Sequence, residues 1–374
     1  MFYLYFSIVN LIIAFLEFLN SKKIFFIISI ILFIGVAGLR YQTGVDWIGY
    51  TEYYKKDYSE MLTRGDIEYG YIIFMYFVKK VGLNYYQFQF LISLLTSLCI
   101  YKFYKNNARY SLLCIYIYIN LYYLRYNMGL QRQLIALSIC LLSYELSKKN
   151  SRIYIWICFL SSISFHFSAI IYWGIFFSLK FIKINMKTQI ILMNITFILT
   201  LLKINLVKPL IKILIMVSEF MNLKFISNKI SVYVGNEFYS GNVGITKSFL
   251  LQFLIIMIIF LFRKPRTMNE KKIYLLTSIY VVVTLLSSMF YVLDRLQIYF
   301  AVFSIILMSY LLDFFKNKLI IFLCLELFFL YPIINFVLHN ETRYYLRYTP
   351  YYNVFFKVNN ETRWKAELGL IGEE

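Results

Sequence analysis

The chain has 374 residues, of which 61% are hydrophobic and only 15% charged, with 38 Lys and Arg against 19 Asp and Glu. This composition excludes a soluble domain of the same length, and apolar runs that do not alternate exclude a transmembrane barrel. The net charge of +19 fits short cytoplasmic loops that set membrane topology, so no nucleic-acid partner is expected. The fold class predicted is therefore an all-α polytopic integral membrane protein.

Apolar runs divided by basic clusters predict about twelve transmembrane helices, within a range of about eleven to fourteen. In chain order they are 2–19, 24–39, 86–104, 110–125, 128–147, 153–166, 167–182, 188–203, 246–262, 273–292, 296–314 and 319–338. With the basic clusters in the cytoplasm, both termini lie outside. The segment 204–217 is expected to be a further half-helix or an interfacial helix.

This topology predicts one membrane-embedded domain over residues 1–338 and an extracytoplasmic tail over 339–374. Two further segments, 40–85 and 218–245, are extracytoplasmic loops. Residues 40–68 hold four basic against six acidic residues. Their negative net charge fits the outer face. Within the first loop, "YGYIIFMYFVKK" at 69–80 is too short to span and predicts an interfacial amphipathic helix.

The sequence carries no pattern that would bind a metal or a cofactor. Its five cysteines have no paired spacing, and its two histidines lie in no cluster of metal ligands, so no disulfide or zinc site is expected. No phosphate-binding glycine-rich loop occurs, which argues against ATP-driven transport.

Ionisable residues at the ends of spanning helices are costly and are functional candidates by default. The predicted topology places Arg40, Arg132, His166 and Arg295 at a similar depth on the outer face, with Asp294 beside the last of them. Each alone has a plain explanation, because such arginines often snorkel to lipid head groups. Together they indicate a site for a lipid-linked anion, since guanidinium groups bind phosphate oxygens bidentately.

The stretch "AGLRYQTGVDWIGY" at 37–50 adds a carboxylate and aromatic rings to the same face. Asp46 and His166 are the groups that would handle a proton. Rings such as Tyr41, Trp47 and Tyr50 would face sugar rings. The pattern thus predicts an anionic lipid head group, a polar ring-shaped substrate above it, and an acid or base between them.

These residues lie in motifs that resemble the Wzy-type polysaccharide polymerases, specifically the EpsG-like branch. The matching pieces are "GLRYQTGVDWIGY" at 38–50, "EYGY" at 68–71, "NMGLQRQLIALSI" at 127–139, "FHFSAII" at 165–171, "DRLQIYF" at 294–300 and "YTPYY" at 348–352. Their order and spacing cover most of the chain. One departure is "LQRQ", where the family more often has Ile or Met before the arginine, although Arg132 and Gln133 still match.

The resemblance implies a multi-span glycosyltransferase that uses a lipid-phosphate-sugar donor at the outer face of the bacterial cytoplasmic membrane. It would join undecaprenyl-diphosphate-linked repeat units into O-antigen, capsule or exopolysaccharide without a cofactor or metal. Its partners would be that lipid-linked glycan, membrane lipid, a chain-length regulator protein and a flippase.

The resemblance also assigns expected roles to individual residues. Asp46 or His166 would be the catalytic base, with Asp46 favoured because a carboxylate stays ionised at neutral pH. Arg40, Arg132 and Arg295 would bind the lipid diphosphate and stabilise its charge in place of a metal. Tyr50, Tyr69, Gln133, Asp294 and Tyr299 would bind the sugar or the acceptor.

Two other classes of membrane protein compete with this interpretation. A lipid-linked oligosaccharide flippase would also have about twelve crossings, but it should carry repeated halves and charges along a cavity open to both faces. A membrane acyltransferase would need a histidine and an acid near a cytoplasmic thioester, whereas His166 is predicted outside.

Overall fold

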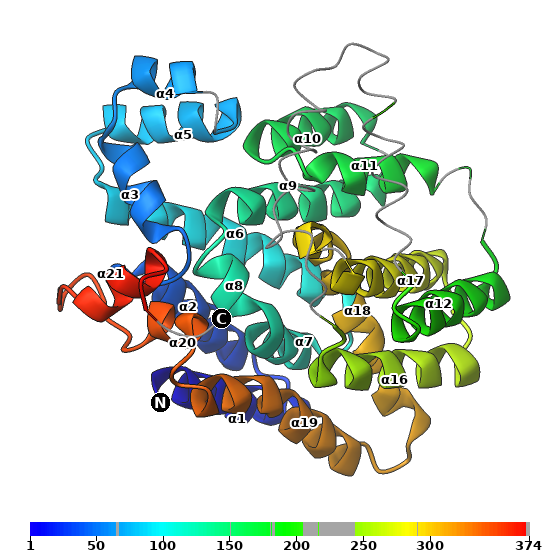
Figure 1. Cartoon of the computed structure of the whole chain (residues 1–374). Coiled ribbons are helices and arrows are strands. Elements are labelled where there is room, and N and C mark those ends of the chain that lie inside the picture. The colour runs from blue at the N-terminus through cyan, green and yellow to red at the C-terminus, as the bar shows by residue number, and fades with distance from the viewer. Residues whose placement is uncertain are drawn as a thin grey trace. The chain divides into compact units, whose positions relative to one another are not determined.

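The computed structural model describes residues 1–64, 67–149, 151–179, 181, 184–204, 216, 244–289 and 291–371. Across these residues the backbone is helical, apart from turns and a single isolated antiparallel bridge between Arg40 and Asn353. The chain divides into two compact units (Figure 1). The first combines Met1–Trp173 with Leu312–Glu374, and the second is Gly174–Leu311.

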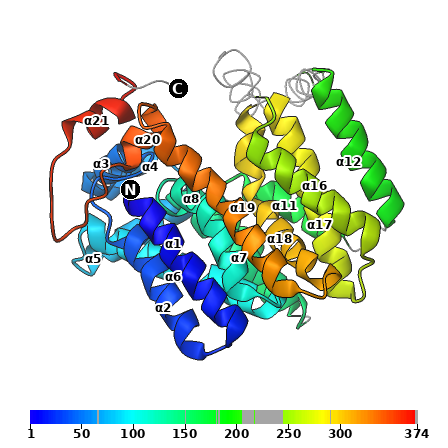
Figure 2. The same cartoon turned by 90° about the horizontal axis from the view of Figure 1, so that it is seen from below.

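The first unit combines long helices with several short ones. The long helices are α1 (Phe2–Leu19), α2 (Lys23–Gly38), α6 (Tyr85–Asn107), α9 (Gln131–Ser147), α10 (Arg152–Phe165) and α19 (Lys318–Leu338). The short ones are α3 (Trp47–Lys55), α4 (Tyr58–Arg64), α5 (Tyr69–Lys80), α7 (Ser111–Tyr118), α8 (Leu124–Asn127), α20 (Arg343–Tyr348) and α21 (Glu361–Glu367). In Figure 2, α20 and α21 lie beside α3, although they are far from it in sequence.

Helix α7 forms the centre of the first unit, because every one of its residues is buried. It packs against α1, α6 and α19 and continues into a π-helix over Ile119–Tyr123. Polar groups inside this bundle bond to one another: the Ser7 hydroxyl donates to the Asn120 side chain at 2.6 Å, and the Tyr116 hydroxyl donates to the Glu326 carbonyl at 2.6 Å. Such internal pairing is what a lipid environment requires.

The second unit contains α12 (Met186–Leu201), α16 (Lys247–Phe262), α17 (Met268–Met289), the 3-10 helix η2 (Tyr291–Leu296) and α18 (Ile298–Ser309). All residues of α18 are buried against α16 and α17. The Tyr280 hydroxyl donates to the Gln252 side chain at 2.9 Å, which ties α17 to α16. Helix α11 (Ala169–Ser178) and the 3-10 helix η3 (Tyr310–Phe314) contain the two boundaries between the units.

Three described helices, α1, α17 and α19, are long and apolar enough to cross a membrane. Several shorter apolar helices accompany them, so the structure supports a membrane protein but does not confirm about twelve crossings. Large apolar side chains lie exposed along α10, where Ile153, Trp156 and Leu160 are 75%, 55% and 66% exposed. An apolar face of this kind is suited to lipid rather than water.

Most predicted helices agree with the observed ones to within a few residues, and 69–80 coincides with α5. The clearest difference is the predicted span 167–182, where α11 contains ten residues. At about 1.5 Å per residue it covers only about half of the apolar thickness of a bilayer. The segment 204–217, apart from residues 204 and 216, and the loop 218–245, apart from 244 and 245, lie outside the described residues.

Candidate functional site

Arg40 follows the end of α2 and is almost fully buried, at 2% exposure. Its Nε donates to the Thr43 carbonyl at 3.1 Å, and one terminal nitrogen donates to the Ala37 carbonyl in the last turn of α2. The Gln89 side chain in turn donates to the Arg40 carbonyl at 2.9 Å. The guanidinium therefore braces the end of a helix whose last carbonyls lack intrahelical partners. Its predicted phosphate contact stays a prediction.

The loop after Arg40 lies directly on the residues that precede α9. Gly44 has a φ of +105°, and a Cβ built on it would lie 2.0 Å from the Met128 carbonyl oxygen. Only glycine fits both the backbone conformation and this close approach. The loop that carries Asp46 is thereby held against the segment that leads to Arg132.

Asp46 stands at the N-cap of α3 with a positive φ of 63°, and its side chain makes no capping bond. Its carboxylate is exposed and forms no ion pair with any described residue. One turn later, Tyr50 is buried, and burial raises the pKa of its hydroxyl to about 12 against a smaller lowering by Arg132. Tyr50 thus lies within electrostatic range of both Asp46 and Arg132, and stays a neutral hydrogen-bonding group at neutral pH.

Arg132, in the first turn of α9, is the centre of a compact group of polar side chains. One of its terminal nitrogens lies 2.5 Å from an Oε of Glu68, and its guanidinium also hydrogen-bonds the Tyr50 hydroxyl. The side chains of Arg132 and Glu68 are each 24% exposed. An ion pair so shielded is pre-organised, since water screens it less than it would at the surface.

The turn that contains His166 joins the same group through Glu68. The second Oε of Glu68 accepts a hydrogen bond from the Phe167 backbone N–H at 3.4 Å. His166 Nδ1 lies 2.7 Å from the Ser168 hydroxyl and 3.3 Å from the Ser168 backbone nitrogen, so the ring is held by its own turn. We call Tyr50, Glu68, Arg132 and the 166–168 turn the Arg132 centre.

Close backbone contact positions α5 so that its N-cap, Glu68, reaches this centre. A Cβ on Gly70 would lie 2.4 Å from the Ser164 hydroxyl, so α5 approaches the end of α10 as only glycine permits. Tyr69 is 65% exposed. Tyr71 donates to the Gln131 side chain at 3.0 Å, and Gln133 is buried in the same first turn of α9.

The remaining predicted site residues belong to the second unit. Asp294 and Arg295 lie in η2 between α17 and α18, and Tyr299 is fully buried in the first turn of α18. The Gln297 side chain donates to Asp294, and Thr284 donates to Gln297 at 3.1 Å. The predicted convergence of Arg295 with Arg40 and Arg132 stays a prediction.

The C-terminal tail packs onto the loop that carries Arg40 and Asp46. The buried Arg363 side chain donates to the Gln42 carbonyl at 2.8 Å and to the Pro350 carbonyl. An Oε of Glu367 accepts from the Asp46 backbone N–H at 2.6 Å, while its other Oε lies 2.9 Å from Arg347. The tail is therefore part of the first unit and fixes the loop's conformation, while its extracytoplasmic position stays a prediction.

Sequence reasoning missed Glu68, Arg363 and Glu367. Glu68 had a usable signal, because it opens the "EYGY" motif just before a predicted amphipathic helix. Arg363 and Glu367 had none, since they lie in a tail more than 300 residues from the loop that they contact.

Comparison with known proteins gives one family. The model of the EpsG family matches residues 23–353, which is most of the chain. No curated protein and no solved structure matches. The match begins at the first residue of α2 and ends before α21, so it includes the whole Arg132 centre.

Proposed function

From this chain's membership of the EpsG family, we propose that it polymerises lipid-diphosphate-linked oligosaccharide repeat units into a surface polysaccharide. The family indicates a polysaccharide-polymerase role in general. The observation that carries the finer proposal is the Arg132 centre, in which a shielded guanidinium lies beside a buried tyrosine hydroxyl and close to an exposed carboxylate.

Transfer of a glycan from a lipid diphosphate places negative charge on the leaving group as its bond to the anomeric carbon breaks. In the proposed mechanism an acceptor hydroxyl attacks that carbon, and the bonding electrons leave with the diphosphate. Arg132 is oriented by Glu68 and Tyr50 before substrate arrives, so it can stabilise this charge without rearrangement. One guanidinium terminal nitrogen pairs with Glu68, and the guanidinium also interacts with Tyr50, so its planar fork is held in one orientation toward the diphosphate.

The acceptor hydroxyl must lose its proton to a base in the same step. Asp46 is the base in this proposal, because its carboxylate is exposed and forms no ion pair among the described residues. His166, held by the 166–168 turn beside Glu68, orients the diphosphate or the acceptor. Arg40 shapes the loop, and Tyr69 and Gln133 contribute to binding of the sugar in this proposal. The binding roles predicted for Asp294, Arg295 and Tyr299 stay predictions.

The proposal places the enzyme in the bacterial cytoplasmic membrane with the Arg132 centre on the extracytoplasmic side. Its lipid-linked substrate would be undecaprenyl diphosphate carrying one repeat unit, delivered by a flippase. In this proposal a separate regulator protein sets chain length.

Deletion of the gene in its native host, followed by a gel of the surface polysaccharide, tests the reaction. If the protein is a polymerase, long chains should disappear while a single repeat unit still reaches the surface. Loss of all surface repeat units would contradict the proposal and indicate a flippase. Expression of the intact chain from a plasmid should restore the ladder of long chains and serves as the control.

A further inference from the structure

A concave site lies at the other end of α5 from Glu68. It is a pocket of about 590 Å³ lined by Asp57, Tyr58, Ser59, Met61, Tyr76, Lys79 and Lys80, and we call it the Asp57 pocket. Its volume is within the usual range for small-molecule sites. None of its lining residues belongs to the Arg132 centre.

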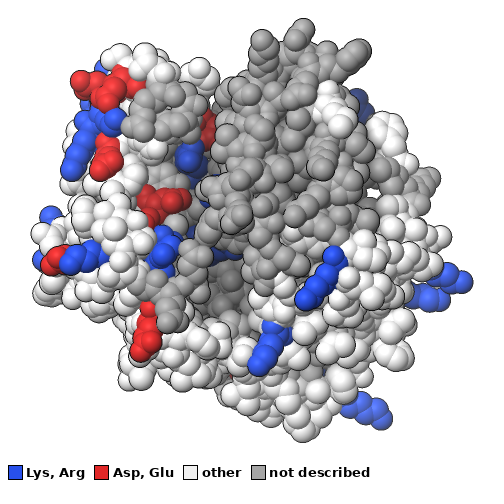
Figure 3. Space-filling view, in the orientation of Figure 1, with Lys and Arg blue, Asp and Glu red and all other residues white. Residues whose placement is uncertain are grey.

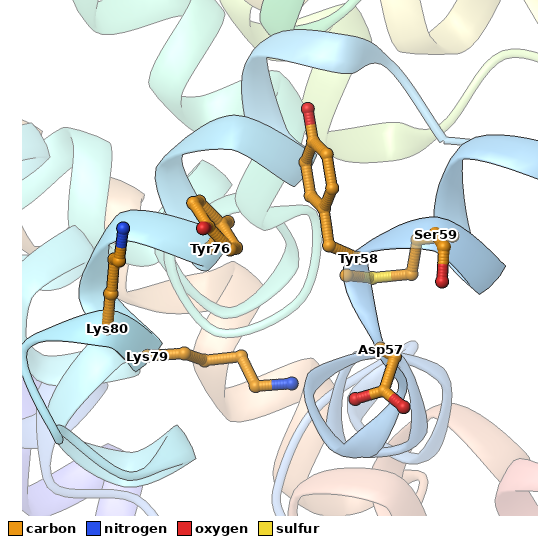
Figure 4. Close-up of a pocket in the computed structure, with 7 residues that line it drawn as sticks. Asp57, Tyr58, Ser59, Tyr76, Lys79 and Lys80 are labelled. Atoms are coloured by element: carbon orange, nitrogen blue, oxygen red, sulfur yellow. The ribbon is translucent and has the colours of Figure 1, made fainter.

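The walls of the Asp57 pocket combine aromatic faces with polar side chains. The rings of Tyr58 and Tyr76 have centroids 4.8 Å apart at an angle of 45°, and Met61, which also lines the pocket, is buried at 1% exposure. In Figure 4 the Asp57 carboxylate and the Lys79 ammonium point toward one another, with Lys80 and Ser59 on opposite sides. Two oblique aromatic rings present a surface suited to the C–H face of a sugar.

The polar groups of the pocket retain much of their hydrogen-bonding capacity. Asp57 and Lys80 form no ion pair with any described residue. Lys79 donates one hydrogen bond to the Lys56 carbonyl at 2.7 Å and lies 5.5 Å from the Tyr54 ring, which fixes its ammonium and leaves two donors. Vicinal sugar hydroxyls offer donors to Asp57 and acceptors to Lys79.

The pocket mixes charges of both signs. Figure 3 shows acidic and basic side chains mixed on the surface formed by α3, α4 and α5. Lys56 is already paired with Glu60 at 2.7 Å, and the Asp57 carboxylate faces Lys79 (Figure 4). A carboxylate among the lysines weakens the attraction for a phosphate, whereas neutral hydroxyls can hydrogen-bond both kinds of group.

The position of the pocket connects it to the reaction centre. Helix α5 begins beside Glu68 and ends at Lys79 and Lys80, so its twelve residues separate the two sites by about 18 Å. Helix α3 makes the same connection, since it begins at Asp46 and leads to Asp57. A glycan whose end lies at the Arg132 centre would reach the Asp57 pocket with a sugar a few residues further along.

We propose that the Asp57 pocket binds a sugar residue of the glycan chain, away from the reacting end. This inference rests on the proposed function for the identity of the glycan, but the binding itself does not require catalysis. Tyr58 and Tyr76 form the stacking surface, and Asp57 and Lys79 bind hydroxyls on the edge of the ring.

Binding by the purified protein in detergent tests this directly. The probe is surface polysaccharide from the host, cut by mild acid to short fragments and labelled with a fluorophore. Tyr58→Ala and Asp57→Asn should each weaken fragment binding about tenfold. Tyr58→Phe keeps the ring, and Glu52→Gln removes an exposed acid of α3 outside the pocket, so both should bind as the unaltered chain does.

Absence of fragment binding, or equal binding by all variants, would overturn the proposal. So would binding only to phosphatidylglycerol vesicles and not to phosphatidylcholine vesicles, because that result would identify an anionic lipid site. Gel filtration should show the same elution for every variant.

The gene deletion and the binding measurements together distinguish failure of this inference from failure of the proposed function. If deletion removes long chains but Asp57→Asn binds fragments normally, only the pocket proposal fails. If deletion leaves long chains but fragment binding depends on Asp57 and Tyr58, the pocket stands as a glycan site and the polymerase proposal fails.

Discussion

The Arg132 centre and the Asp57 pocket are the two polar regions at opposite ends of α5, and they differ in the pairing and exposure of their charged side chains. Arg132 and Glu68 are paired at 2.5 Å and mostly shielded, whereas Asp57 and Lys80 line an open pocket without ion pairs among described residues. A pre-paired, shielded charge is already oriented for a charge that develops during reaction. Open, unpaired groups are suited to a contact that must form and release as a chain lengthens.

The largest expected effect comes from removing the guanidinium of the Arg132 centre. Arg132→Ala should lower the rate of polymer formation by about 10²–10³, the loss typical of one transition-state donor. Arg132→Lys should restore little, because a lysine lacks the planar fork. The measurement is the polysaccharide ladder made by membranes that contain equal amounts of tagged protein.

Arg152→Ala, which removes an exposed arginine at the start of α10, is the matched control and should leave the ladder unchanged. Full-length polymer from the Arg132→Ala chain would contradict the proposed role of the Arg132 centre in the reaction, and with it the proposed difference between the two regions.

An intermediate effect is expected from Glu68, which positions Arg132 and does not touch substrate. Glu68→Gln should slow polymer formation about tenfold, and Glu68→Asp should recover part of the loss. The informative measurement is a double-mutant cycle: combined with Arg132→Ala, Glu68→Gln should add almost nothing, because both act through one interaction. Independent, multiplying losses would mean that Glu68 has a separate, merely structural role.

The smallest effect should come from the contact between α21 and the loop of Asp46. Burial raises the pKa of Glu367 to about 7, against smaller lowering by Arg347 and the Asp46 N–H. Since this folded pKa lies above the ordinary value, docking of the tail favours the protonated form of Glu367. The contribution of this group to docking is complete below about pH 4.5 and is lost as pH rises through about 7.

Tryptic cleavage after Arg363 and Lys365 measures this docking. The ratio of the cleavage rate of the unaltered chain to that of Glu367→Gln should rise about twofold or more between pH 6 and pH 8, because the amide cannot ionise. Comparison at each pH cancels the pH dependence of the protease. A ratio independent of pH would show that Glu367 does not titrate in this range.

Much of the fold could be predicted from sequence because hydrophobicity and helix length are local properties. The runs at 2–19, 24–39 and 319–338 correspond to α1, α2 and α19, and 69–80 is α5 to the residue. The predicted span 110–125 is interrupted by a π-helix at Ile119–Tyr123. Hydropathy gives no sign of that interruption, since a π-turn depends on packing around α7.

The candidate site was predicted only in part, because the sequence identifies costly residues but not their partners. It selected Arg132 and His166 because ionisable groups are costly near a membrane, and Asp46 and Tyr50 for the acid and the rings of their stretch. The structure brings Arg132, Tyr50 and the turn of His166 into one group. It did not select Glu68, which joins them.

The sequence by itself determined the membrane class, the family and most helix boundaries, since each follows from residues that are neighbours in the chain or occur in a fixed order. Only the tertiary structure decided which charges meet. Glu68 and Arg132 are 64 residues apart, and Glu367 and Asp46 are 321 residues apart. The physical reason is that an ion pair or a capping bond depends on distances of a few ångströms, which are set by how helices pack and not by the pattern along any one of them.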